Sequence, residues 1–147
     1  MDFELPDDIK EFCDVTRAIV RDLLPYEAEF QATGKVPPIV RQTLVDNGYF
    51  GLSLPEEYGG LGLGALAPAA VQIELARLPP PFWTELRPLM GPGARNIVYH
   101  ASEAQKQQLI PGMVSGEIGI AFALTEPNSG SDPGSMRTAA TRNADGW

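Results

Sequence analysis

The chain has 147 residues, 44% of them hydrophobic, and is long enough to bury a core in one domain, or in one domain and part of another. Its formal net charge of −8 argues against nucleic-acid binding, which needs a basic surface. No apolar run approaches the ~20 residues of a membrane span, and the acidic N-terminus is unlike a signal peptide, so we expect a cytoplasmic protein.

A first helix is predicted over residues 9–24, where apolar side chains recur at three- and four-residue spacing. Pro6 can open this helix, and Pro25 should kink or end it. Cys13 is the single cysteine, so no internal disulfide can form. Because it lies on the apolar face of the helix, we expect a small buried side chain.

Two prolines at 37–38 open a second predicted helix, and Gly48 is placed to cap its C-terminal end. An aromatic- and glycine-rich connection follows over residues 49–64. A third helix is predicted from about residue 65 to 78, where a run of prolines stops it.

The stretch 82–90 gives no clear pattern, because Pro88 interrupts it. A short helix is predicted near 94–100, and Ser102 with Gln105 has the spacing of a capping box that begins another helix. The buried face of that last helix is expected to contain Leu109, Ile110, Met113 and Val114.

The period of the pattern changes after the helices. Apolar and small residues alternate over 117–124 and again over 137–143, which predicts two strands, and Asp145-Gly146 is typical of a hairpin turn. The sequence therefore predicts a mainly α protein with a helical domain at 1–116 and an incomplete β segment at 117–147. Because the second strand lacks a partner, we expect an edge that invites pairing with another chain.

Several possible sites have weak support. The glycines within 60–65 fit a loose dinucleotide-binding pattern, but no buried strand precedes them, so a tight loop between helices is the better interpretation. His100 is the only histidine and has no partner at ligand spacing, so no metal site is expected. Ser129 and Ser131 lack the Gly-x-Ser-x-Gly elbow of a hydrolase nucleophile.

The segment 121–132 offers more chemistry. Small residues at Ala121 and Ala123 would let a flat ring approach, and Thr125 places a hydroxyl at the end of the predicted strand. The turn at 128–132 can aim successive backbone N–H groups at phosphate oxygens. From these residues alone two interpretations stay open: a site for a planar ring with a charged tail, or an ordinary strand and polar loop.

Three separated motifs, in order, resemble the acyl-CoA dehydrogenases. The first, in the helical region, is Gly48-Tyr49-Phe50-Gly51-Leu52 with Leu54-Pro55-Glu56-Glu57-Tyr58-Gly59-Gly60. The second is Gln105-Lys106-Gln107-Gln108-Leu109-Ile110-Pro111 with Ser115-Gly116-Glu117. The third is Leu124-Thr125-Glu126-Pro127 with Gly130-Ser131-Asp132, followed by Thr138, Ala140 and Gly146-Trp147.

The resemblance implies a fold and a reaction. The family has a helical N-terminal domain, a β-barrel-like middle domain and a C-terminal helical domain, so this chain would be the first domain and the first strands of the second. Members bind FAD and form an α,β-double bond in an acyl-CoA thioester, a glutamate serving as the base. An electron-transferring flavoprotein reoxidises the flavin, and many members are homo-oligomers.

The resemblance also assigns residues. It implies that Phe122, Ala123, Leu124 and Thr125 line the flavin, with the Thr125 hydroxyl at its pyrimidine edge. Gly130 and Ser131 would meet the FAD pyrophosphate, and Ser131 would also contact the acyl-CoA. Side chains of the stretch 82–90 would border the acyl pocket or pack in the core.

The resemblance does not provide a catalytic residue. The general-base glutamate is expected beyond residue 147, and Glu126 is not given that role. We therefore expect a truncated acyl-CoA dehydrogenase that is inactive as this chain alone. Two alternatives stay open: a stand-alone, non-catalytic chain that associates with another subunit, or an acyl-CoA oxidase-like flavoprotein.

Overall fold

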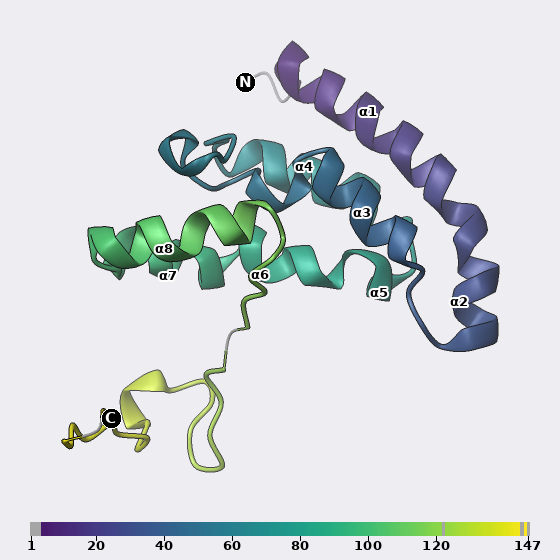
Figure 1. Ribbon diagram of the computed structural model, residues 1–147. Helices are drawn as coiled ribbons and strands as arrows, with labels where there is room; N and C mark the ends of the chain where they lie inside the picture. The colour runs from purple at the N-terminus through teal and green to yellow at the C-terminus, as the bar shows by residue number, and fades with distance from the viewer. Residues whose placement is uncertain (1–3, 122, 145, 147) are drawn as a thin grey trace.

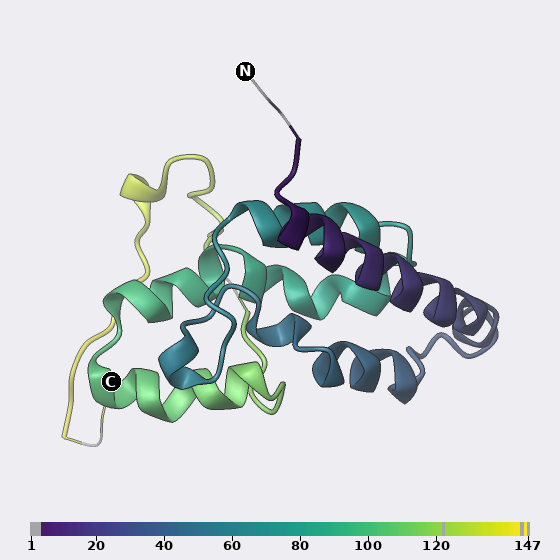
Figure 2. The ribbon, with the colours of Figure 1, turned by 90° about the horizontal axis from the view of Figure 1, so that it is seen from above.

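Eight α-helices, joined by short 3₁₀ turns, precede an extended tail in the computed structural model, which describes residues 4–121, 123–144 and 146 (Figure 1). The helix α1, Asp7–Leu23, packs along α4, Leu66–Leu75. The chain after α8, Glu103–Val114, runs away from the helices in Figure 1, and seen from above it overlaps them (Figure 2). The helices therefore make one packed unit, and the tail projects from it.

The first predicted helix is confirmed, and a second follows it directly. Helix α1 begins after Pro6, and its apolar stripe is buried. Pro25 lies in a 3₁₀ turn, Leu24–Tyr26, after which the chain continues into α2, Glu27–Thr33. The sequence pattern did not predict α2, because a proline was expected to end or kink the helix.

The second and third predicted helices are α3, Pro38–Asp46, and α4. Gly48 adopts the left-handed conformation expected beyond a helix end, with φ of 75°. In the connection between them, 3₁₀ turns cover Tyr49–Gly51 and Glu56–Tyr58.

The glycine-rich part of that connection folds back on itself. The backbone N–H of Leu61 donates to the carbonyl of Gly51 at 2.9 Å, and that of Leu63 to the carbonyl of Leu52 at 2.9 Å. A Cβ at Gly60 would lie 2.1 Å from the carbonyl oxygen of Leu54, so only glycine fits there. The glycines thus serve close backbone packing, in agreement with the interpretation of residues 60–65 as a tight loop.

The stretch without a clear pattern forms two short helices, α5, Pro80–Trp83, and α6, Arg87–Met90, joined by a 3₁₀ turn. Helix α7, Pro92–His100, comes next. The capping box of α8 is confirmed, because the Ser102 hydroxyl accepts the N–H of Gln105 at 3.3 Å and the Gln105 side chain accepts the N–H of Ser102 at 2.9 Å.

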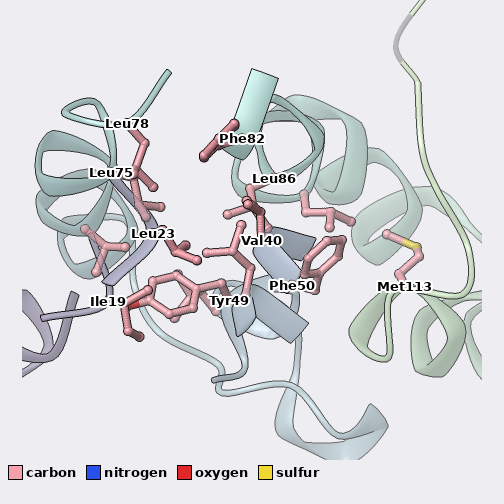
Figure 3. Packing of buried hydrophobic residues seen from close by; sticks show 14 of the residues in the cluster. Ile19, Leu23, Val40, Tyr49, Phe50, Leu75, Leu78, Phe82, Leu86 and Met113 are labelled. Carbon is pink, nitrogen blue, oxygen red and sulfur yellow. The ribbon is translucent and has the colours of Figure 1, made fainter. Parts of the chain in front are cut away.

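The core lies where the helices converge (Figure 3). Leu75, Leu86 and Met113, from three distant segments, are fully buried in it. One buried polar pair joins α1 to this core: the Thr16 and Tyr49 hydroxyls are 2.7 Å apart. Because Thr16 donates its proton to the Phe12 carbonyl at 2.7 Å, Tyr49 is the donor in the pair.

A charged contact also fixes α1 against α4. The nearly buried Glu74 carboxylate accepts from the Arg17 guanidinium at 2.8 to 2.9 Å, and Arg77 lies 3.6 Å from its other oxygen. Burial raises the pKa of the neighbouring Cys13 thiol, which is buried as predicted. Periodicity gave no sign of the Arg17–Glu74 pair, since its partners are far apart in sequence.

The predicted strands are not present among the described residues of 117–146. Only isolated bridges occur, Glu126 with Ser129 and Asn143 with Gly146. A strand needs a neighbour for its N–H and C=O groups, and the tail runs away from the helices without one in its described part (Figure 1). The start of a β domain at 117 therefore stays a prediction.

In the described part of the chain, no helix is both long enough and apolar enough to span a membrane.

Candidate functional site

The loop after Thr125 is closed by the carboxylate of Glu126. Its two oxygens accept the backbone N–H groups of Arg137 at 2.8 Å and Thr138 at 2.9 Å. These bonds, the one from Arg137 first, hold the pKa of the Glu126 carboxyl below its usual range. Glu126 thus joins the two ends of a loop covering residues 126–138, which we call the clamped loop.

The two serines of the clamped loop have different roles. Ser129 is buried, and its hydroxyl donates to the Asp132 carbonyl at 2.7 Å. Its backbone also pairs with Glu126 in both directions, at 2.8 and 3.2 Å. Ser131 is exposed, and within the described residues neither its hydroxyl nor its N–H has a partner. Ser129 therefore shapes the loop, and Ser131 offers its polar groups outward.

The other site residues expected from the sequence lie close by. Thr125 is exposed, with a hydroxyl that binds nothing else in the described part of the chain. A Cβ built on Gly130 would lie 3.8 Å from the Thr125 methyl group, so the two residues face each other across the turn. Ala123 and Leu124 are exposed just before them. Phe122 lies outside the described residues.

These donors suit a ligand with a phosphate and a flat polar edge. The N–H groups of Gly130 and Ser131 are consecutive in the chain and free among the described residues, so both are available to an anion. The Thr125 hydroxyl can both donate and accept. The residues present fit a flavin nucleotide on these grounds, whereas no group of three metal-binding side chains occurs among the described residues.

The direction in which the tail leaves the helices is set by Arg41. Its guanidinium donates to the carbonyl of Gly116, pairs with Glu85 at 2.9 Å, and lies 5.0 Å from the ring centre of Phe50. Gly116 has φ of 76°, a backbone conformation that favours glycine. Since Gly116 immediately precedes the tail, these contacts orient the segment that carries the clamped loop.

A cleft of about 400 Å³ adjoins the beginning of that tail. Thr84, Arg87, Pro88, Pro92 and Gly93 line it. A Cβ at Gly93 would lie 3.6 Å from the Cδ1 of Ile120, so Ile120 packs against one of the lining residues. We call it the α6–α7 cleft.

A second, larger cleft of about 660 Å³ is lined by the 53–65 connection and by parts of α6 and α7. None of its lining residues belongs to the tail, and Leu89 is the one that comes from the stretch 82–90. Of the two clefts, the α6–α7 cleft is the one next to the beginning of the tail, through the contact of Gly93 with Ile120.

Comparison with known proteins identifies the family. The family model described as "Acyl-CoA dehydrogenase, N-terminal domain" matches residues 6–117, well over half of the chain. The chain belongs to the acyl-CoA dehydrogenase family. The resemblance found in the three motifs is thereby confirmed.

Individual relatives agree with this assignment. The probable acyl-CoA dehydrogenase FadE25 of Mycobacterium tuberculosis is 31% identical over 147 residues, which cover 99% of this chain and 37% of the relative. The butyryl-CoA dehydrogenase structure from Megasphaera elsdenii matches with a TM-score of 0.83 and 30% identity, over 99% of this chain and 38% of that one. A chain in the structure of the electron transferring flavoprotein of Acidaminococcus fermentans matches with a TM-score of 0.85 and 28% identity, over 99% and 38%. The present chain thus spans little more than a third of the length of these relatives.

Sequence reasoning missed three residues that shape this region. Glu126 was recognised only as part of a motif, and its bonds to Arg137 and Thr138 were not expected. Neither Arg41 nor Arg87 was singled out. The residues next to an arginine in sequence do not show which distant groups it will meet, so only the folded structure identifies these contacts.

Proposed function

We propose that this chain is the N-terminal part of an FAD-dependent acyl-CoA dehydrogenase that forms an α,β-double bond in an acyl-CoA thioester. When bound, FAD supplies the acceptor for the hydride removed from the substrate. The observation that carries the proposal is the clamped loop in a chain of this family: it contains Gly130 and Ser131 and directly follows Thr125, and the polar groups of all three are free among the described residues.

In this proposal the residues of the clamped loop and of the segment before it each have a task. The Thr125 hydroxyl bonds the polar edge of the flavin ring, and Phe122, Ala123 and Leu124 form the wall beside it. The N–H groups of Gly130 and Ser131 bind the pyrophosphate, and Ser131 also contacts the acyl-CoA. Helix α6 and Thr84 in the turn before it border the acyl pocket at the α6–α7 cleft.

Glu126 holds the loop and is not the catalytic base. Its carboxylate is already occupied by two backbone N–H groups, and its pKa is lowered, which makes it a weaker base. We propose that the base lies in the part of the protein beyond residue 147, and that the 147-residue chain alone does not turn over an acyl-CoA. The complete enzyme would form a homo-oligomer and pass its electrons to an electron-transferring flavoprotein.

The test uses the complete polypeptide that contains these residues. We expect it to bind FAD and its flavin colour to bleach when an acyl-CoA is added without oxygen. Thr125→Val, which keeps the shape and removes the hydroxyl, should weaken FAD binding about tenfold, the typical effect of losing a hydrogen bond to a polar group. Thr141→Val serves as the control, because Thr141 is an exposed residue outside the site.

Three outcomes would contradict the proposal or a part of it. If the protein is colourless and FAD does not bind to it, the assignment of FAD as its cofactor is wrong. If the protein binds FAD but no acyl-CoA reduces it, the assignment of acyl-CoA thioesters as substrates is wrong. Turnover by the 147-residue chain alone would contradict the placement of the base.

A further inference from the structure

The side chain of Arg41, on α3, connects three segments that are far apart in sequence. Its Nε donates to Oε2 of Glu85 at 2.9 Å, and its Nη2 donates to the carbonyl oxygen of Gly116. The guanidinium also lies 5.0 Å from the ring centre of Phe50. Because a guanidinium is planar and presents its N–H groups in a rigid fork, it holds the two acceptors at a fixed separation.

The two acceptors belong to the regions that the proposed function assigns to substrate and cofactor. Glu85 lies in the 3₁₀ turn Thr84–Leu86, directly before α6, where we place the border of the acyl pocket. Gly116 lies just after the end of α8 and begins the tail that carries Thr125. Arg41 is therefore a direct link between the wall of the acyl pocket and the flavin segment.

The beginning of the tail is packed against the helices. A Cβ on Gly116 would lie 3.0 Å from Cγ2 of Val45 and 3.3 Å from the guanidinium nitrogens of Arg41, so the backbone passes directly over α3. The N–H of Ile118 donates to the carbonyl of Gly112 at 2.8 Å, and a Cβ on Gly112 would lie 2.6 Å from Cδ1 of Ile118. The tail therefore leaves the helices from a fixed point, and a shift at Gly116 would be passed to the residues after it.

The ion pair within this link contributes little to stability. The side chains of Arg41 and Glu85 are 43% and 62% exposed, and an ion pair at such exposure is weak because water and salt screen it. What the two hydrogen bonds of Arg41 determine is the geometry of the link. We therefore expect substitutions of Arg41 to leave the chain folded and to change how its parts are placed.

We propose that Arg41 is a positioning residue for hydride removal: by bridging Glu85 and Gly116 it sets the placement of the acyl pocket relative to the flavin segment. This inference rests on the proposed function. Reacting atoms must lie about 3 to 3.5 Å apart, and a misplacement of about 1 Å can lower a rate about a hundredfold. Loss of the bridge should thus slow the chemical step, while the binding of FAD and of the acyl-CoA, which other residues provide, is kept.

The experiment compares Arg41→Gln with the wild type, in the complete polypeptide loaded with FAD. Butanoyl-, hexanoyl- and octanoyl-CoA are tried, and the one that reduces the wild-type flavin fastest is used. Three quantities are measured: the Kd of FAD, the Kd of the acyl-CoA with the flavin already reduced, and the rate constant of flavin reduction at saturating acyl-CoA without oxygen. We expect the rate constant to fall at least about tenfold and both Kd values to stay within about twofold.

Further variants assign the effect to the bridge. Arg41→Lys keeps the charge beside Glu85 but lacks the planar fork, so its rate should lie between those of Arg41→Gln and the wild type. This variant also carries the test if Arg41→Gln does not fold. Arg21→Gln is the matched control: Arg21 is an exposed arginine on α1 without an ion pair among the described residues, so all three quantities should stay within about twofold.

The outcomes separate the inference from the proposed function. If the folded Arg41 variants reduce the flavin at the wild-type rate, the inference is wrong and the proposed function stands. If the rate, both affinities and the Tm fall together, Arg41 only stabilises the fold, and the inference is again wrong. If no acyl-CoA reduces the flavin of the wild type, the proposed function fails and the inference fails with it.

Discussion

The buried hydroxyl pair between α1 and the core allows a prediction with an internal control. Thr16 is fully buried and Tyr49 is 4% exposed, so water cannot replace a lost partner. Thr16→Val removes the acceptor and leaves the Tyr49 hydroxyl buried without one, which costs about 2 kcal/mol. Tyr49→Phe removes the donor, and the Thr16 hydroxyl keeps its bond to the Phe12 carbonyl, so the cost is about 1 kcal/mol.

The double variant distinguishes this account from simple loss of packing. With both hydroxyls absent no buried donor is left unsatisfied, so the double variant should be about 1 kcal/mol less stable than the wild type, more stable than Thr16→Val alone. Denaturant unfolding, followed by far-ultraviolet circular dichroism at neutral pH, measures all four proteins. If the two single costs simply add in the double variant, Tyr49 is not the donor to Thr16 and the reasoning is refuted.

Three further predictions concern the loops. Gly60→Ala should destabilise the protein by about 3 kcal/mol or more, because its methyl group would meet a backbone carbonyl at 2.1 Å, whereas Gly64→Ala, with nothing within 4 Å, should be near neutral in thermal unfolding. Glu126→Gln should speed hydrogen exchange of the two amides that its carboxylate binds. Because the pKa of Glu126 is lowered in the folded chain, this carboxylate stabilises the loop above its ordinary pKa, and the wild type should lose that protection as the pH falls through the lower folded value. The hydrogen bond to Glu103 raises the pKa of Tyr58 to about 12. This hydrogen bond therefore stabilises the folded chain fully at a pH below the ordinary tyrosine pKa near 10, and the stabilisation is lost as the pH rises towards 12. Ultraviolet titration of Tyr58 in Glu103→Gln should show a pKa nearer the ordinary value, and an unchanged titration would contradict the assigned cause.

The clamped loop illustrates how a carboxylate near a candidate site can have a structural task. Glu126 stands beside Thr125 in the motif, where its charge invites assignment as a base. Its two oxygens instead bind backbone N–H groups at 2.8 and 2.9 Å, which keeps residues 126 and 137–138 together. The exposed groups of Ser131 are thereby presented on a closed loop, and this orientation is what the proposed cofactor site needs.

Local patterns in the sequence determined the helices. The spacing of apolar residues predicted α1, α3 and α4, and a short helix was expected near α7. The capping box that begins α8 was predicted at Ser102, and both of its hydrogen bonds are present. These features depend on residues three or four positions apart, so the interactions that form them are contained in the local sequence. The three family motifs likewise needed no coordinates, because they are fixed strings of residues, and the family they indicated is confirmed.

Tertiary structure alone decided which distant groups meet. The pairing of Arg17 with Glu74 and the hydrogen bond from Arg41 to Gly116 join residues that no local pattern connects. The alternating residues of the tail also show that a local pattern does not decide a tertiary feature. Alternation shows which face of a strand would be apolar, but a strand forms only when a neighbouring strand takes its backbone hydrogen bonds. Among the described residues of the tail only isolated bridges occur, and no neighbouring strand is present.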